Sequence, residues 1–168
     1  DCTLILGDNL FFGHDLALLL REAIDSNDGA TVLSAAARYN PNPEVTSLLI
    51  RAGADMTYET ASGASLLMLA SRYSPSSDVI KSLIRAGFDV NTGNDSGVTP
   101  LIYAANFNTN ANIIDTLVEA GADVNISSKN GLTPLICAIT SNSDNEVALA
   151  LLDAKADIGV KDSNGKTV

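Results

Sequence analysis

Apolar and polar residues along this chain fall into blocks that recur at a constant interval. The interval is 34 residues, and a glycine opens each block: Gly29, Gly63, Gly97, Gly131 and Gly165. Self-similarity at a fixed period of this length is typical of repeat proteins, in which stacked units build an elongated array. We therefore divide the chain into four full repeats, 29–62, 63–96, 97–130 and 131–164, and a partial repeat, 165–168.

The first apolar block of each repeat predicts a short helix. The third position is always Ser or Thr, whose side chain can cap a helix by accepting a backbone N–H bond. In the four full repeats the fifth position is always Leu and the eighth is always Ala. A small residue repeated on one helix face indicates close contact with the neighbouring repeat. The predicted first helices span 32–39, 66–73, 100–107 and 134–141.

A polar break and a second apolar block follow in each repeat. The breaks, such as Asn40-Pro41-Asn42-Pro43, consist of turn-forming residues. The apolar residues after them recur at helical spacing, which predicts a second helix. We expect this helix to end at Gly53, Gly87 and Gly121, because glycine suits the left-handed conformation that follows a helix. An extended loop or hairpin then leads to the next repeat.

Neither predicted helix can bury its apolar side within its own repeat. Neighbouring repeats must therefore stack, with contacts mostly between adjacent units. The expected fold class is all-α: a solenoid of helix-turn-helix repeats with connecting hairpin loops.

Two sequence signatures carry a resemblance to a known family. Gly97-Val98-Thr99-Pro100-Leu101 and Gly131-Leu132-Thr133-Pro134-Leu135 open two repeats, and Ala120-Gly121-Ala122-Asp123-Val124-Asn125 closes one. These segments resemble the ankyrin repeat, whose usual unit is about 33 residues. The fourth repeat departs from the pattern at Lys155, where the helix-ending Gly is expected, and at Ile158-Gly159. The resemblance implies a scaffold that binds proteins and has no chemistry of its own.

Residues 1–28 do not fit the 34-residue pattern. Thr3–Leu6 predicts a short strand, and Asp15 is placed to cap a helix that ends near Ile24. The segment from Leu4 to Leu16 is similar to sugar-1-phosphate nucleotidylyltransferases, most of all to the glucose-1-phosphate thymidylyltransferase family. That resemblance implies a magnesium-binding role for Asp8. We treat 1–28 as a nucleotidylyltransferase-like fragment whose helix packs on the first repeat as a cap.

Catalysis does not follow from this second resemblance. Phosphoryl chemistry requires several groups positioned together, and the sequence has neither a suitable glycine-rich loop nor alternating strands and helices. We therefore expect no enzyme activity, no catalytic residue, no cofactor and no metal site, with Asp8 a metal ligand only if the transferase resemblance holds. The alternative hypothesis is a fragment or fusion of such a transferase, inactive as this chain. A third hypothesis is a spacer within a longer protein.

Charge and composition narrow the possible partners. The net charge of −10 disfavours binding to nucleic acid or to anionic lipid. No apolar stretch is long enough to cross a membrane. The two cysteines, Cys2 and Cys137, make no disulfide framework, and the single histidine, His14, makes no zinc cluster. We expect a cytoplasmic monomer.

Several residues that recur or vary between repeats are candidates for protein binding. The recurring set forms an aromatic and basic row at the end of the first helices: Arg38, Tyr39, Arg72, Tyr73 and Phe107. Aromatic residues and Arg are enriched at interfaces, but the same row could be a stacking ladder buried between repeats. The second set lies at the variable hairpin tips and comprises Tyr58, Asn94 and Lys129. Residues at hairpin tips vary in surfaces that bind selectively, but they vary equally in loops that have no binding role.

One acidic residue recurs at the same position of each full repeat. Asp55, Asp89, Asp123 and Asp157 recur once per repeat, which favours hydrogen bonds within a turn over a calcium site.

The first two repeats are close to neutral, whereas the third and fourth are acidic. This gradient could steer an unknown protein partner with a basic surface along the concave face and hairpin tips. It is also compatible with an ordinary soluble surface.

Overall fold

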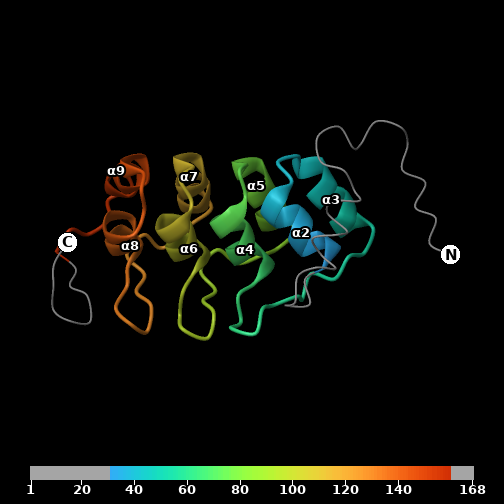
Figure 1. Cartoon of the computed structure of the whole chain (residues 1–168), viewed down its shortest axis with the longest axis horizontal. Coiled ribbons are helices and arrows are strands. Elements are labelled where there is room, and N and C mark those ends of the chain that lie inside the picture. Colours follow the sequence, from blue (N-terminus) through green and yellow to red (C-terminus); the bar gives the residue numbers. More distant parts are fainter. Residues whose placement is uncertain (1–30, 160–168) are drawn as a thin grey trace.

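The computed structural model describes residues 31–159, and helices arranged in successive pairs dominate this part of the chain (Figure 1). The first helices of the four repeats are α2 (Val32–Tyr39), α4 (Leu66–Tyr73), α6 (Pro100–Phe107) and α8 (Pro134–Thr140). The second helices are α3 (Pro43–Arg51), α5 (Ser77–Arg85), α7 (Ala111–Glu119) and α9 (Asn145–Asp153). The predicted all-α solenoid is confirmed for these residues.

The helices form two rows along an elongated stack. Each first helix packs on the first helix of the next repeat, and each second helix packs on the next second helix. Figure 1 shows α2, α4, α6 and α8 in one row and α3, α5, α7 and α9 in the other, with the connecting loops projecting beside the first row. Because contacts run between neighbours, one core cluster extends through all four repeats, and Ala35, Ala36 and Val45 form a second, smaller cluster in the first repeat.

Side-chain caps start the first helices, as the sequence predicts. The hydroxyls of Thr31, Ser65, Thr99 and Thr133 each accept a hydrogen bond from the backbone N–H three residues later. The bounds of the first three helices are confirmed. The fourth ends one residue early, at Thr140, because Ser141 has left the helical conformation.

The second helices begin earlier than the polar breaks indicate. Pro43, the last residue of the predicted break 40–43, is already the first residue of α3, and Ser77 and Ala111 take the equivalent places in α5 and α7. In α3 and α7 the preceding asparagine, Asn42 or Asn110, accepts the N–H bond that caps the helix. The polar residues therefore belong partly to the helix start.

A left-handed residue lies two positions after the end of each second helix. Gly53, Gly87 and Gly121 have φ values of 85°, 104° and 92°, as predicted. Lys155 takes the equivalent place in the fourth repeat at φ 68°. Its N–H donates to the Leu152 carbonyl, matching the bond from Gly121 N–H to the Val118 carbonyl. The fourth repeat keeps this geometry without a glycine.

The core consists of apolar side chains that recur at fixed repeat positions. Leu67, Leu101 and Leu135 are buried, and the repeated alanines that predicted close helix contact are also buried: Ala36, Ala70, Ala104 and Ala138. Ala104, for example, has no exposed surface. Small side chains here let α4, α6 and α8 approach one another closely.

Asparagine side chains after the first helices join consecutive repeats. Asn108 Nδ2 donates to the carbonyls of Ser71 and Ser74, at 3.1 and 3.0 Å. Asn142 Nδ2 donates to the carbonyls of Ala105 and Asn108, at 2.9 and 2.8 Å. Both side chains reach back one repeat, so each one satisfies two carbonyls at the end of the preceding helix.

A second set of asparagines joins the repeats on the loop side. Asn91 Oδ1 accepts a bond from Asp123 N–H, and Asn91 Nδ2 donates to the Gly121 carbonyl, both at 2.9 Å. Asn125 Oδ1 accepts a bond from Asp157 N–H at 2.8 Å. We call these side chains the loop clasps. The equivalent residue of the first repeat is Thr57, which makes no such bond between described residues.

Hairpin loops connect the repeats and contact one another through their backbones. Each loop closes on itself, for example through the bond from Asn94 N–H to the Val98 carbonyl. Neighbouring loops are joined by bonds from Asp95 N–H to the Ser62 carbonyl and from Lys129 N–H to the Ser96 carbonyl. The loops are thus joined to one another along the array.

Candidate protein-binding surface

The predicted aromatic and basic row forms a continuous ladder across the first three repeats. The ring centroids of Tyr39 and Tyr73 lie 6.2 Å apart, although the residues belong to different repeats. The Arg38 guanidinium lies 5.2 Å from the Tyr39 ring centroid and 5.0 Å from that of Tyr73. These contacts are within the usual range of cation–π attraction.

Arg72 extends the ladder from the second repeat to the third. Its guanidinium lies 4.9 Å from the centroid of Tyr73 and 3.8 Å from that of Phe107. Tyr73 nevertheless keeps 39% of its surface exposed, and Phe107 keeps 47%. The rings therefore stack between repeats and also face solvent. We call Arg38, Tyr39, Arg72, Tyr73 and Phe107 the ladder.

One residue of this surface is not predicted from the repeat pattern. Tyr103 lies beside Phe107 with ring centroids 6.2 Å apart. Its hydroxyl accepts a hydrogen bond from Asn94 Nδ2 at 3.3 Å, which connects the ladder to the hairpin loop. The equivalent residues of the other repeats are Ala35, Leu69 and Cys137, so no recurring aromatic marks the position.

A groove borders the ladder on the side of the helix-connecting turns. Its volume is about 420 Å³, and it lies between the second and third repeats. Arg72, Tyr73 and Phe107 form one part of its lining, and the turn residues 74–75 and 108–110 form the rest. The groove places backbone and carboxamide groups beside the exposed rings.

The predicted hairpin-tip residues Asn94 and Lys129 have contacts within the molecule. Asn94 Oδ1 accepts bonds from Ser96 N–H and Val98 N–H, which fixes its loop. Lys129 Nζ donates to the Asp95 carbonyl at 2.7 Å, so it joins two neighbouring loops. Tyr58 is half-buried in the loop after α3. Asn94 is connected to the ladder through Tyr103.

The recurring aspartates form hydrogen bonds within turns, which confirms that interpretation. The carboxylates of Asp55, Asp89, Asp123 and Asp157 each accept a bond from the backbone N–H two residues later. Hydrogen bonds from Thr57 lower the pKa of Asp55, and bonds from Asn91 and Thr92 lower the pKa of Asp89. Among residues 31–159, no cluster of three His, Cys, Asp or Glu side chains could hold a metal ion.

Cys137 is buried in α8, as expected for a small apolar residue. Burial raises the pKa of its thiol to about 11. A thiol with this pKa is almost entirely protonated near neutral pH and is a poor nucleophile. The side chain therefore belongs to the core between the third and fourth repeats.

Several sequence predictions lie outside the described residues. These are Cys2, His14, the strand and capping helix of 1–28, and Asp8, which was expected to bind a metal only if the transferase resemblance holds. No finding from the structure or from the comparison with known families supports the nucleotidylyltransferase resemblance. Within the described part of the chain, no helix is both long and apolar enough to span a membrane.

Comparison with family models supports the repeat interpretation directly. The family described as ankyrin repeats (3 copies) matches residues 10–94 and again residues 67–162. The two matches overlap at residues 67–94, and together they cover residues 10–162, which is most of the chain. The first match begins inside the segment 1–28 that the 34-residue pattern leaves out. With the paired helices, the left-handed helix ends and the stacked loops, these matches show that the chain belongs to the ankyrin repeat family.

Proposed function

We propose that this protein is a non-catalytic scaffold that binds a protein partner through the ladder. Ankyrin repeats indicate a protein–protein interaction scaffold, and the ladder is where this chain gathers aromatic and basic side chains. The observation that carries the proposal is the Arg72–Phe107 stack. Its members contact at 3.8 Å, yet nearly half of the Phe107 surface remains exposed.

This arrangement suits binding for an energetic reason. Association costs free energy when long side chains lose their rotamer freedom. Stacking between Tyr73 and Phe107 already restricts Arg72 before a partner arrives. Trp, Tyr and Arg anchors of this kind dominate the affinity of many interfaces. A partner segment that covers Phe107 would also fill the adjoining groove.

Charge supports one orientation of the partner. The arginines of the ladder lie in the first two repeats, and acidic residues predominate in the third and fourth. A partner with a basic surface would approach the acidic repeats, with its acidic or polar groups toward Arg72. The same field would raise the association rate at low salt.

Site-specific photocrosslinking tests this proposal. A photoreactive phenylalanine analogue replaces Phe107 in one variant and Leu149 in the control. Leu149 lies on α9 in the other row of helices and is similarly exposed, at 51%. We expect a discrete crosslinked protein from Phe107 and much less of it from Leu149. Equal crosslinking from both positions, or from Leu149 alone, would reject the ladder as the binding surface.

The crosslinked partner then allows a quantitative test. Arg72→Ala and Phe107→Ala should each weaken its binding by about thirtyfold or more, the loss typical of an interface hot spot. Leu149→Ala should leave the affinity within about twofold. Circular dichroism and the melting temperature separate lost binding from lost folding.

A further inference from the structure

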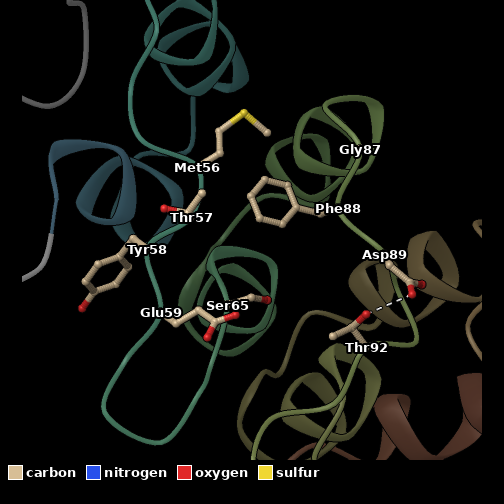
Figure 2. A pocket seen from close by; sticks show the side chains of 9 residues that line it. All are labelled: Met56, Thr57, Tyr58, Glu59, Ser65, Gly87, Phe88, Asp89 and Thr92. Atoms are coloured by element: carbon tan, nitrogen blue, oxygen red, sulfur yellow. Dashed lines mark hydrogen bonds between the residues drawn. The ribbon is translucent and has the colours of Figure 1, made fainter.

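A small pocket opens where the loop of the first repeat meets the second repeat. Its volume is about 200 Å³. Met56, Thr57 and Glu59 line it from the first repeat, and Gly87, Phe88 and Asp89 line it from the second. Figure 2 shows Met56 and Phe88 close together at one side, with Glu59 and Asp89 separated across the pocket.

The next junction along the array shows what normally occupies this position. The Asn91 loop clasp donates to the Gly121 carbonyl and accepts from Asp123 N–H. Asn125 makes the second of these bonds at the third junction, with Asp157 N–H. One carboxamide side chain thus bridges a carbonyl and an N–H that lie two residues apart.

At the junction between the first and second repeats, no carboxamide side chain of the described residues bonds to the equivalent backbone groups. Thr57 takes the clasp position, and its hydroxyl donates instead to Asp55 Oδ1 at 2.6 Å. The corresponding groups of the second repeat are the Gly87 carbonyl and Asp89 N–H, and neither is hydrogen-bonded to another residue of the range 31–159. Both residues line the pocket.

The Gly87 carbonyl and the Asp89 N–H together indicate which chemical group of a ligand can bind here. This pair favours a donor and an acceptor side by side on one ligand group, which is the arrangement that Asn91 presents to the equivalent backbone groups. A carboxylate has no donor, an ammonium group has no acceptor, and the N–H and C=O of one trans peptide point in opposite directions. A primary carboxamide presents both on one edge, as Asn91 does.

We propose that this pocket binds an asparagine or glutamine side chain of a protein partner. The carboxamide NH₂ donates to the Gly87 carbonyl, and its oxygen accepts from Asp89 N–H. The apolar side formed by Met56 and Phe88 takes the methylene groups of the ligand side chain. The carboxylates of Glu59 and Asp89 disfavour an acidic ligand. The pocket is distinct from the ladder and adds a specificity element at the loop side of the array.

Nuclear magnetic resonance titration of the full chain tests the proposal. The probe is N-acetyl-glutamine methylamide, and its leucine, glutamate and lysine counterparts are controls with the same backbone groups. We expect saturable shifts at the amides of Gly87, Phe88 and Asp89 with the glutamine probe, with an affinity in the millimolar range. No shift there, equal shifts with the leucine probe, or tighter binding of the lysine probe would overturn the proposal.

A substitution inside the pocket provides an independent readout. Thr57→Asn should supply the missing clasp, abolish binding of the glutamine probe and slow hydrogen exchange of the Asp89 amide by about fivefold. Thr57→Ser, which keeps the hydroxyl, should retain probe binding and normal exchange. If Thr57→Asn leaves both probe binding and Asp89 exchange unchanged, the pocket does not accept a carboxamide.

Discussion

At the residue scale, hydrogen bonds of asparagine side chains join one repeat to the next. Asn108 and Asn142 reach back to carbonyls of the preceding repeat, whereas Asn91 and Asn125 reach forward to backbone groups of the following one. Each bond is modest alone, but a buried acceptor left without its donor is costly. The stability of each junction therefore depends on a few identifiable side chains.

Asn108→Ala should destabilise the protein by about 1–3 kcal/mol, because two buried carbonyls lose their donor. Urea unfolding monitored by circular dichroism gives the free energy of unfolding. Asn112→Ala is the matched control, since Asn112 is exposed and its side chain makes no hydrogen bond to another described residue. Equal effects of the two substitutions would show that the Asn108 bonds contribute nothing.

Cys137 should react slowly with thiol reagents in the folded protein. Burial holds the thiol protonated with a pKa of about 11, so the thiolate is scarce at pH 8. In a Cys2→Ser background at pH 8, we expect iodoacetamide to label Cys137 slowly in the folded protein and rapidly once the protein is unfolded. Rapid labelling at pH 7 without unfolding would contradict the buried placement.

The sequence predicted side chains that act locally better than it predicted side chains that act between repeats. The helix-capping hydroxyls, the left-handed glycines and the turn aspartates were predictable, because each acts on backbone atoms a few residues away. The asparagine bonds were not, since Asn108 reads only as part of a polar break and its acceptors lie a full repeat earlier. Tyr103 was missed for a related reason: it recurs in no other repeat, and its contacts depend on packing.

At the element scale, the second helices differ mainly in how they end. Three are followed two residues later by a glycine, and α9 is followed by Lys155 in the same left-handed conformation. A side chain raises the energy of that conformation through contact between Cβ and the backbone. The fourth repeat is therefore the one whose helix end carries strain.

Lys155→Gly should stabilise the protein by about 1 kcal/mol, because glycine adopts positive φ without that strain. The melting temperature provides the measurement. Gly121→Ala is the converse control: a Cβ there meets no atom within 4 Å, so the expected loss of about 1 kcal/mol is purely conformational. A lower melting temperature for Lys155→Gly would show that the lysine side chain makes stabilising contacts.

At the scale of the whole molecule, stability is distributed along one dimension. Interior repeats are covered on both sides, whereas the fourth repeat leaves Ile139, Leu149 and Ile158 half-exposed or more. Gly159 also occupies the loop-clasp position of that repeat, where Asn91 and Asn125 stand earlier in the array. In such an array, local unfolding begins where the fewest interfaces hold a repeat.

Hydrogen exchange of the free protein should accordingly be slowest in the second and third repeats. We expect α4–α7 to retain amide protons longest and α8–α9 to exchange earlier. Mass spectrometry with peptides that separate 66–120 from 134–153 resolves the difference. Uniform protection across both regions would indicate that the array unfolds as a single unit.

The most direct test of the central claim is hydrogen exchange of the protein with and without the partner captured by crosslinking. Binding through the ladder predicts slower exchange in 70–75 and 104–110, which contain the ends of α4 and α6 and the border of the groove. The amides of α3, α5, α7 and α9 should change little. Protection confined to those second helices, with 70–75 and 104–110 unchanged, would contradict the ladder as the partner-binding surface.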